Sequence, residues 1–506
     1  MSKGYRPIIR YRMRRGLPSR AGFSRRDVLK GAAAAAAGAM LAPMLGGVGG
    51  CASRNLERTD RRAHGMSVIV IGAGFAGLAC ADTLVRSGAH VTVLEASGRP
   101  GGRVLSDRKF IPGRTVELGA EFIGENHPTC IRYARRFNLP LIEADEYEFE
   151  DGIIINGELI RGAAADEISG EIDSTLATFI DMAQAVDPVR PWTSPNAEQL
   201  DAQNMAQLID SMRISDRSKR LMAAIEEADN GVAPSRMSML GYLAMVSGGG
   251  FQLFYEASET HRIDGGNDRI ATSIARSLGQ RVRYRQQVVA IDRNADAATV
   301  RTADGGSFSA DAVVLAIPPS VWHKIAFNTH EVREIPQMGS NVKLVLKLDR
   351  PVWEQQNLTP ELRSDGLVQM TWISATARQA APLSLTLFSG GQQSEALQKM
   401  DAQRRRHNAV ASLAAAYPDL GDAVTQDLFM DWPSMPHALA SYSFPAPGEV
   451  MRYGPTLVDG VDDGLAPLRF AGEHTSYGFI GYMEGALSSG MRTAESLITA
   501  RAPLTA

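Results

Sequence analysis

The sequence predicts an α/β protein organised around a parallel sheet, and three observations near the start of its globular part support this class. Residues 67–71 form an apolar, β-branched run, which is typical of a strand buried on both faces. Glycines follow directly and lead into a helix of small residues. A second apolar strand, residues 90–94, ends in Glu95. This order of strand, glycine turn, helix and strand predicts a Rossmann-type domain.

Three glycines after the first strand predict a dinucleotide site. Gly72 permits the tight turn, Gly74 lets the backbone approach a pyrophosphate, and Gly77 lets the helix pack against the sheet. The backbone N–H groups at the start of the helix, at Phe75 and Ala76, then face the phosphates. The same motif also arises by chance in other strand–turn–helix units, so a second signal is needed.

The second signal is the acid that ends the second strand. Glu95 stands eighteen residues beyond Gly77, where a carboxylate accepts hydrogen bonds from the ribose hydroxyls of an adenosine. Ala96 follows it and is expected to line the same site. The sequence therefore predicts a bound dinucleotide rather than a fortuitous turn.

Length and composition limit the remaining possibilities. At 506 residues the chain exceeds what one hydrophobic core usually holds, so two or more domains are expected. The formal net charge of −3 gives no reason to expect a nucleic-acid partner. Three cysteines cannot supply a disulfide framework for a chain of this size, and the scattered histidines predict no metal site.

The N-terminal segment departs from this average composition. Residues 1–30 carry ten Arg or Lys and one acid. Arg25 and Arg26 precede an Ala/Gly-rich run at 31–50, and this order resembles a twin-arginine export signal. A permanent transmembrane anchor is disfavoured, because eight alanines, six glycines and Pro43 make the run weakly apolar and interrupt a helix. We therefore expect a protein exported by the twin-arginine machinery to the periplasm or the outer face of the cell envelope.

Two interpretations stay open at the end of the signal region, residues 1–51. Residues 48–51 loosely resemble a lipoprotein processing box, in which case Cys51 becomes a lipidated N-terminus that anchors the protein. Ordinary cleavage near the same place is the alternative. Residues 52–65 are polar and charged and are expected to form a linker.

A second glycine-rich element follows the second strand. Gly101 and Gly102 free the backbone to lie close to a ligand, and Arg103 is able to neutralise phosphate charge. Residues 116–124 then predict another strand with a glycine-rich exit. That exit contains Gly119, Ala120 and Glu121.

Residues 66–124 taken together resemble the FAD-binding region of the flavin-containing amine oxidase family, whose members include monoamine, polyamine and L-amino acid oxidases. An NAD-dependent dehydrogenase has no standard use for the Gly-Gly-Arg element, so FAD is favoured over NAD. The resemblance implies an α/β fold with a discontinuous Rossmann-type FAD-binding domain, plus an α+β substrate domain with a mixed sheet and a helical subdomain. The expected FAD-binding parts are residues 66–125, 251–325 and 456–500, and the expected substrate-domain parts are 126–250 (helical) and 326–455 (sheet).

The far end of the chain carries the next most specific signal. Residues 468–475 predict a buried strand that ends at an acid, and a helix of small residues follows. In the family, the acid that matches Glu473, next to Gly472, binds a flavin ribityl hydroxyl. The helix N-terminus near Met483 faces the N1–C2 edge of the isoalloxazine ring, where its dipole stabilises reduced, anionic flavin.

Two further residues have structural alternatives. In relatives, the backbone of the valine that matches Val289 meets the adenine, but a valine in the predicted strand 287–291 is also expected to belong to the sheet core. His474 is interpreted as a loop histidine near the cofactor rather than as a base.

A lysine and two tyrosines are the candidate catalytic residues. Lys343 lies on an otherwise apolar predicted strand, and a lysine in such a place must pair, snorkel or act chemically. In the family, the matching lysine holds a water against flavin N5 and assists reoxidation by oxygen; Lys347 is the alternative. Tyr442 and Tyr482 match the two aromatic walls of the substrate site. Some monoamine oxidases attach the flavin through a cysteine just before the first wall. Here that position falls on Ala440 or Ser441, so non-covalent FAD is expected.

The resemblance implies FAD-dependent oxidation of an amine to an imine by hydride transfer to flavin N5, and hydrolysis of the imine. Oxygen, a cytochrome or a quinone then reoxidises the flavin. Residues 119–127 offer two acids and no arginine, which favours an amine over an amino acid, and Glu121 facing the cavity would repel a carboxylate. The alternatives are an L-amino acid oxidase, a flavin desaturase or porphyrinogen-type oxidase, and a non-catalytic, FAD-stabilised envelope protein.

Overall fold

In the computed structural model, the described residues are 63–144, 149–329, 335–374 and 381–501, and they all belong to one compact unit. The predicted signal region 1–51, including Cys51, lies outside them, as do residues 52–62 of the predicted linker.

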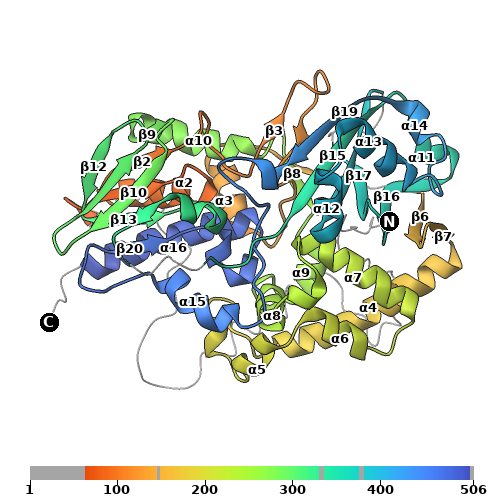
Figure 1. The fold of residues 1–506 in the computed structure, drawn as a ribbon, viewed down its shortest axis with the longest axis horizontal. Helices are drawn as coiled ribbons and strands as arrows, with labels where there is room; N and C mark the ends of the chain where they lie inside the picture. Colours follow the sequence, from red (N-terminus) through yellow and green to blue (C-terminus); the bar gives the residue numbers. More distant parts are fainter. Residues whose placement is uncertain (1–62, 145–148, 330–334, 375–380, 502–506) are drawn as a thin grey trace. The chain divides into compact units, whose positions relative to one another are not determined.

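A parallel sheet of five strands carries the glycine motif (Figure 1). Its order is β20-β13-β1-β2-β9, so strands from distant stretches of the chain lie side by side. The predicted doubly buried strand is confirmed, because Val68 and Val70 pack in one core while Ile69 and Ile71 pack in another. The strands are β1 (Ser67–Ile71), β2 (His90–Glu95), β9 (Val282–Tyr284), β13 (Ala312–Leu315) and β20 (Leu468–Phe470).

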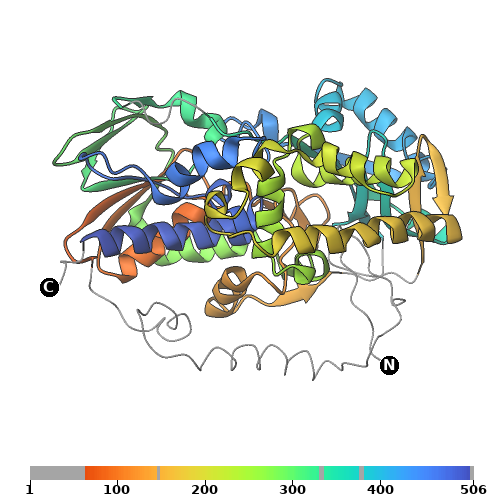
Figure 2. The ribbon, with the colours of Figure 1, turned by 90° about the horizontal axis from the view of Figure 1, so that it is seen from below.

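Helices from both ends of the chain share one core on the parallel sheet. Figure 2 shows the C-terminal helix α16, in blue, beside the first helix α2, in orange. This approach depends on small residues: a Cβ placed on Gly490 would lie 2.1 Å from the carbonyl oxygen of Ala76. The helices of this core are α2 (Phe75–Arg86), α3 (Pro128–Arg136), α10 (Asp268–Leu278) and α16 (Met483–Arg501).

A smaller sheet packs on the other face of the parallel sheet, where Ile291 and Val300 share a core with Leu315 and Phe470. Its order is β12-β11-β10-β14. Helix α15 (Glu449–Asp459) contributes Leu457 to the same core. The strands are β10 (Val288–Arg293), β11 (Ala298–Thr302), β12 (Ser307–Ala310) and β14 (Ala326–Phe327).

A sheet of seven strands forms the second half of the unit, with the order β19-β15-β18-β17-β16-β6-β7. It is mixed, as predicted, because β16 and β6 run parallel while the other neighbours are antiparallel. The strands are β6 (Glu150–Ile155), β7 (Glu158–Arg161), β15 (Asn341–Leu348), β16 (Leu358–Ser364), β17 (Met370–Ile373), β18 (Leu383–Gly390) and β19 (Val424–Asp431).

The two faces of this sheet meet different helices, and the alternation along β15 decides where Lys343 points. Val342, Leu344 and Leu346 pack with α11–α14 on one face, so Lys343 projects from the other face. On that side, Trp372 packs with α4–α9. The first set is α11 (Val352–Gln355), α12 (Gly391–Gln398), α13 (Ala402–Ala411) and α14 (Leu420–Ala423); the second is α4 (Ala163–Ala183), α5 (Ala197–Ala202), α6 (Met205–Ser211), α7 (Asp216–Asn230), α8 (Met239–Gly248) and α9 (Gln252–Ala257).

Two short strand pairs complete the fold. In the segment 116–124, predicted as a strand with a glycine-rich exit, the strand is limited to β4 and a loop that contains Gly119 follows it. The loop packs tightly on the preceding glycine-rich element, since a Cβ on Gly119 would lie 2.0 Å from the carbonyl oxygen of Arg103. The pairs are β3 (Ser106–Asp107) with β4 (Val116–Glu117) and β5 (Leu141–Glu143) with β8 (His261–Ile263).

The predicted domain boundaries stay predictions, and the structure differs from them in two places. The segment 126–250 was expected to be the helical part of the substrate domain. Its first helix, α3, shares the core of the parallel sheet, and its strands β6 and β7 join the seven-stranded sheet.

Candidate active site

One continuous cavity of about 490 Å³ reaches from the glycine motif to the seven-stranded sheet. Most residues predicted from the sequence for cofactor or substrate line it, although they come from distant parts of the chain. They are Gly72, Gly74, Phe75, Ala76, Glu95, Ala96, Gly101, Gly102, Arg103, Gly119, Ala120, Glu121, Lys343, Tyr442, Gly472, Glu473, Tyr482 and Met483.

Two predicted cofactor residues are not part of the cavity wall. Gly77 packs against the glycine turn, where an added Cβ would lie 2.0 Å from the carbonyl oxygen of Gly72. Val289 is half-buried on β10, and its neighbours Gln287 and Val288 line the cavity. The side chain of Val288 is 6% exposed.

The glycines form a backbone cradle at the N-terminus of α2. Gly72 has a φ of +104°, and a Cβ there would lie 2.6 Å from the carbonyl oxygen of Ala316. The N–H of Gly101 donates to the carbonyl oxygen of Ala73 at 2.9 Å, which brings the two glycine-rich elements together. The first turn of α2 holds no acidic residue. This leaves helix N–H groups and bare backbone for an anionic group such as a pyrophosphate.

Glu95 ties the cradle to the end of β2. One carboxylate oxygen accepts from the N–H of Ala73 at 2.7 Å and the other from the N–H of Ser97 at 2.8 Å. Because each carboxylate oxygen has two lone pairs, Glu95 retains acceptor sites for two ribose hydroxyls.

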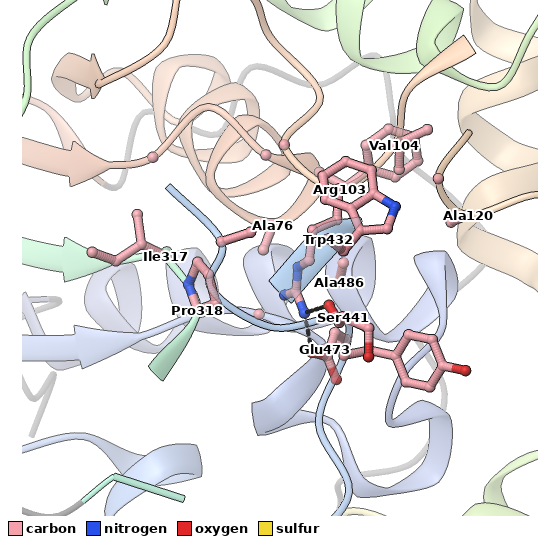
Figure 3. A pocket seen from close by; sticks show the side chains of 18 of the residues that line it. Ala76, Arg103, Val104, Ala120, Ile317, Pro318, Trp432, Ser441, Glu473 and Ala486 are labelled. Carbon is pink, nitrogen blue, oxygen red and sulfur yellow. Dashed lines mark hydrogen bonds and ion pairs between the residues drawn. The ribbon is translucent and has the colours of Figure 1, made fainter. Parts of the chain in front are cut away.

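Arg103 and Glu473 form an ion pair in the cavity wall, which Figure 3 shows with Ser441. The Nη1 of Arg103 donates to Glu473 at 2.9 Å and to the carbonyl oxygen of Ser441 at 2.7 Å. Glu473 also accepts from the hydroxyl of Ser443 at 2.6 Å and from the N–H of Gly481 at 2.8 Å. Burial alone would raise the pKa of Glu473, but Arg103 and these donors hold it below its ordinary value.

The hydrogen-bonding of His474 indicates whether the cavity fits a cofactor. The ring is 2% exposed, and neither nitrogen has a hydrogen-bond partner among the described residues. Burial, opposed by Glu473, lowers the pKa of His474 to about 4, so the ring is neutral. A buried imidazole beside a cavity calls for a partner from a molecule that fills the cavity. The lone ring nitrogens, the bare glycine backbone and Glu95 together fit FAD.

A buried charge cluster lies where the cavity meets the seven-stranded sheet. The Nζ of Lys343 donates to the carbonyl oxygens of Glu117 at 3.1 Å and Gly119 at 2.9 Å, and to the carboxylate of Glu121 at 2.7 Å. The other oxygen of Glu121 pairs with Arg262 at 2.9 Å. The side chains of Lys343, Glu121 and Arg262 are 7%, 2% and 3% exposed. Glu121 lines the cavity, but two cations balance its charge, so the predicted repulsion of a substrate carboxylate is not supported.

The two predicted tyrosines are held by their hydroxyl groups. The hydroxyl of Tyr442 donates to the carbonyl oxygen of Asp229 at 2.7 Å, and that of Tyr482 donates to the carboxylate of Glu259 at 3.3 Å. Gly481 allows the two segments to approach, since a Cβ there would lie 3.3 Å from the ring of Tyr442. Both side chains line the same cavity.

Sequence reasoning missed several residues of this region. Asp229, Glu259 and Trp372 line the cavity, and Arg262 stands behind it. No local motif marks any of them. Arg262 lies one residue before the family-like segment that begins at Ile263, and the backbone bridge between His261 and Ile123 brings it to the loop of Glu121.

Cysteine chemistry and metals contribute little to the described site. The free cysteines of the described residues, Cys80 and Cys130, are buried and lie outside the cavity wall. The hydroxyl of Ser441 donates to Asn341 at 2.6 Å. Across the described residues, no group of three or more His, Cys, Asp or Glu side chains is arranged to hold a metal ion. No helix in the same part of the chain is long and apolar enough to cross a membrane.

Comparisons with known proteins show the family to which the chain belongs. The family model for flavin-containing amine oxidoreductases matches residues 75–498, and the model for the twin-arginine signal sequence matches residues 22–42. The chain is similar to the flavin-containing amine oxidase of Danio rerio, with 26% identity and coverage of 87% of each chain. It is also similar to flavin-containing amine oxidase B of Homo sapiens, with 25% identity and coverage of 86% of each chain.

Its structure resembles that of cyclohexylamine oxidase from Brevibacterium oxydans, with a TM-score of 0.76, 25% identity, and coverage of 86% of this chain and 99% of the other. The predictions of an FAD cofactor, held non-covalently, and of a twin-arginine export signal are confirmed. The chain therefore belongs to the flavin-containing amine oxidoreductase family.

Proposed function

We propose that this exported enzyme oxidises an amine to an imine, which water hydrolyses to an aldehyde or ketone and ammonia or a smaller amine. One observation carries the proposal: Tyr442, Tyr482 and Lys343 line the same cavity as the glycine cradle and Glu473. A substrate between the tyrosines would therefore lie in the same space as the reacting end of the cofactor.

The cofactor would be held by groups at the other end of the cavity. Gly74, Gly101 and Gly102 offer backbone to its pyrophosphate, Glu95 accepts from its ribose, and Glu473 accepts from its ribityl chain. When bound, FAD supplies the acceptor for the hydride that leaves the amine-bearing carbon, at flavin N5.

The tyrosines orient the amine and exclude water. Their hydroxyls are engaged by Asp229 and Glu259, which fixes the rings. An aromatic face holds a cation by about 0.5–2 kcal/mol, so the pair can bind an ammonium before it loses its proton. A neutral amine then needs no strong base.

The charges near the tyrosines support an amine over an amino acid. An amino acid oxidase usually neutralises the substrate carboxylate with an arginine. Among the described residues of the cavity wall the arginines are Arg99 and Arg103, and both donate to protein acceptors near the glycine cradle. Asp229 and Glu259 line the cavity near the tyrosines.

The electron acceptor and the destination are also proposed. Lys343 assists reoxidation by oxygen, while a cytochrome or quinone is the alternative acceptor. The twin-arginine signal supports the periplasm or the outer face of the envelope, with Cys51 as a lipid anchor if it is processed as a lipoprotein.

Anaerobic bleaching of the flavin absorbance band tests the function. The purified yellow protein is mixed without oxygen with a panel of primary, secondary and diamines and the matching L-amino acids. Amines are expected to bleach the band, and amino acids are expected to leave it unchanged. Bleaching by amino acids alone would make the enzyme an amino acid oxidase. A band that no amine bleaches, although dithionite does, would contradict the proposal.

A further inference from the structure

The charge cluster at the sheet end of the cavity has a feature that the family resemblance does not explain. A lysine ammonium has three N–H donors. In Lys343 the three acceptors within hydrogen-bond distance are the carbonyl oxygens of Glu117 and Gly119 and the carboxylate of Glu121. Each donor therefore has a protein partner, and none is left to hold a water molecule in the cavity.

Glu121 is the centre of the cluster. Its two oxygens pair with two different cations, Lys343 at 2.7 Å and Arg262 at 2.9 Å. Arg262 is held in turn by the carbonyl oxygen of Ile373 at 3.1 Å and lies over the ring of Phe122, 4.7 Å from its centroid. Two cations and one anion leave one net positive charge on these three side chains.

Stability alone does not account for such a cluster. Buried ion pairs cost desolvation that their attraction barely repays, and apolar side chains of the same volume are often as stable. The three residues come from the loop after β4, from β8 and from β15, and Lys343 and Glu121 line the cavity. The Nζ of Lys343 also lies 5.4 Å from the ring centroid of Trp372, another wall residue. With the neighbouring carboxyl of Glu117 protonated, as burial favours below about pH 7, a net positive charge therefore faces the space where the proposed reaction occurs.

We propose that Glu121 is a positioning residue that, with Arg262, locks Lys343 in place, so that Lys343 acts on the cavity through its charge and not through a free N–H. The inference rests on the proposed function, in which Lys343 assists reoxidation. A fixed positive charge beside a group that gains electrons favours its reduced form.

The midpoint potential of the bound flavin distinguishes charge from hydrogen bonding. It is measured on the holoenzyme without amine, by dithionite titration against a reference dye. Lys343→Met removes the net charge and is expected to lower the potential. Glu121→Gln leaves two cations and is expected to raise it. A potential that stays unchanged or falls in Glu121→Gln, as it does in Lys343→Met, would overturn the proposal.

A second pair of variants covers the case in which Glu121→Gln does not fold. Lys343→Arg keeps the charge and is expected to keep the wild-type potential, whereas Lys343→Gln keeps N–H donors without charge and is expected to match Lys343→Met. The reverse pattern would overturn the proposal. Lys347→Met, at a half-buried position on the same strand whose ammonium donates to Gln426, is the control and should leave the potential unchanged. These potentials need no substrate, so failure of the amine panel and failure of this inference are separate results.

Discussion

Glu473 and Glu121 are both buried glutamates in the wall of one cavity, yet their surroundings differ in charge. Glu473 has one cation, Arg103, and otherwise neutral donors from Ser443 and Gly481. Glu121 has two cations, Lys343 and Arg262. The Glu473 pair is neutral in sum, whereas the Glu121 cluster keeps one positive charge.

The difference separates holding a cofactor from influencing its chemistry. A neutral, fully hydrogen-bonded pair suits the recognition of polar hydroxyls, because it adds little field of its own. The net charge that remains on the Glu121 cluster exerts an electrostatic effect over several ångströms in a cavity from which water is excluded. The same residue type therefore serves two purposes, and its cationic neighbours decide which.

Breaking the neutral pair is expected to have the largest effect. Glu473→Leu removes four hydrogen-bond contacts and leaves Arg103 buried without its carboxylate, which typically costs about 3–5 kcal/mol. We expect the purified protein to have lost its flavin, measured as the flavin-to-protein absorbance ratio, and to melt at a lower temperature. Glu125→Gln, a substitution at an exposed position, is the control. A yellow Glu473→Leu protein with wild-type flavin content would show that the pair is dispensable.

The pH dependence of the free energy of unfolding examines the surroundings of the Glu121 cluster through Glu117. The carbonyl oxygen of Glu117 accepts a hydrogen bond from Lys343. Burial raises the pKa of Glu117 from 4.5 to about 7. Between these values the folded chain binds its proton more tightly than the unfolded chain, so stability is lost as the pH rises through this window. Glu117→Gln removes that loss, and its free energy of unfolding relative to wild type should rise by at most about 3 kcal/mol from pH 4.5 to 7.

Urea unfolding at several pH values measures how the stability difference between Glu117→Gln and wild type changes with pH. The exposed Glu158→Gln serves as the matched variant, with a stability difference that stays constant across the range. If the curves of Glu117→Gln and wild type run parallel, Glu117 does not titrate in this window.

Removing the charge of Lys343 should slow the reoxidation of the flavin more than its reduction. Lys343→Met is expected to slow flavin reoxidation by oxygen on the order of a hundredfold, the size typical of losing one preorganised electrostatic partner, and to slow flavin reduction less. Stopped-flow measurements of the two half-reactions give the rates separately. Lys347→Met should behave as wild type. Equal reoxidation rates in Lys343→Met and wild type would reject its assignment.

A third buried glutamate, Glu484, sharpens the comparison because its hydrogen-bond partners at the start of α3 are neutral. Its carboxylate accepts from the N–H groups of Thr129 and Cys130 and from the side chains of the same two residues. Glu484→Ala should cost about 1–2 kcal/mol, as other lost helix caps do, without changing flavin potential. Thermal unfolding of the holoenzyme checks the first part and the dye titration the second. A shifted flavin potential with unchanged stability would show that Glu484, like Glu121, influences the flavin rather than the stability of the fold.

The sequence predicted what is local and missed what depends on packing. The glycine turn, Glu95 and the strand before Glu473 follow from short-range patterns, and the parallel sheet and the cavity-lining glycines agree with them. The pairing of Glu121 with Lys343 joins residues 222 positions apart, and no periodicity encodes it. The backbone contact of Val289 with the adenine stays a prediction, and its neighbours Gln287 and Val288 line the cavity. In the segment 116–124, predicted as a strand with a glycine-rich exit, the strand ends at Glu117, and Gly119 packs against the backbone of Arg103.

The packing of α16 on α2 ties the two ends of the globular part together. While the chain is being synthesised, the glycine turn emerges early, but Glu473, Tyr482 and Met483 are still missing from the wall. The cavity wall is therefore complete only after both ends of the globular part have been synthesised and α16 has packed on α2.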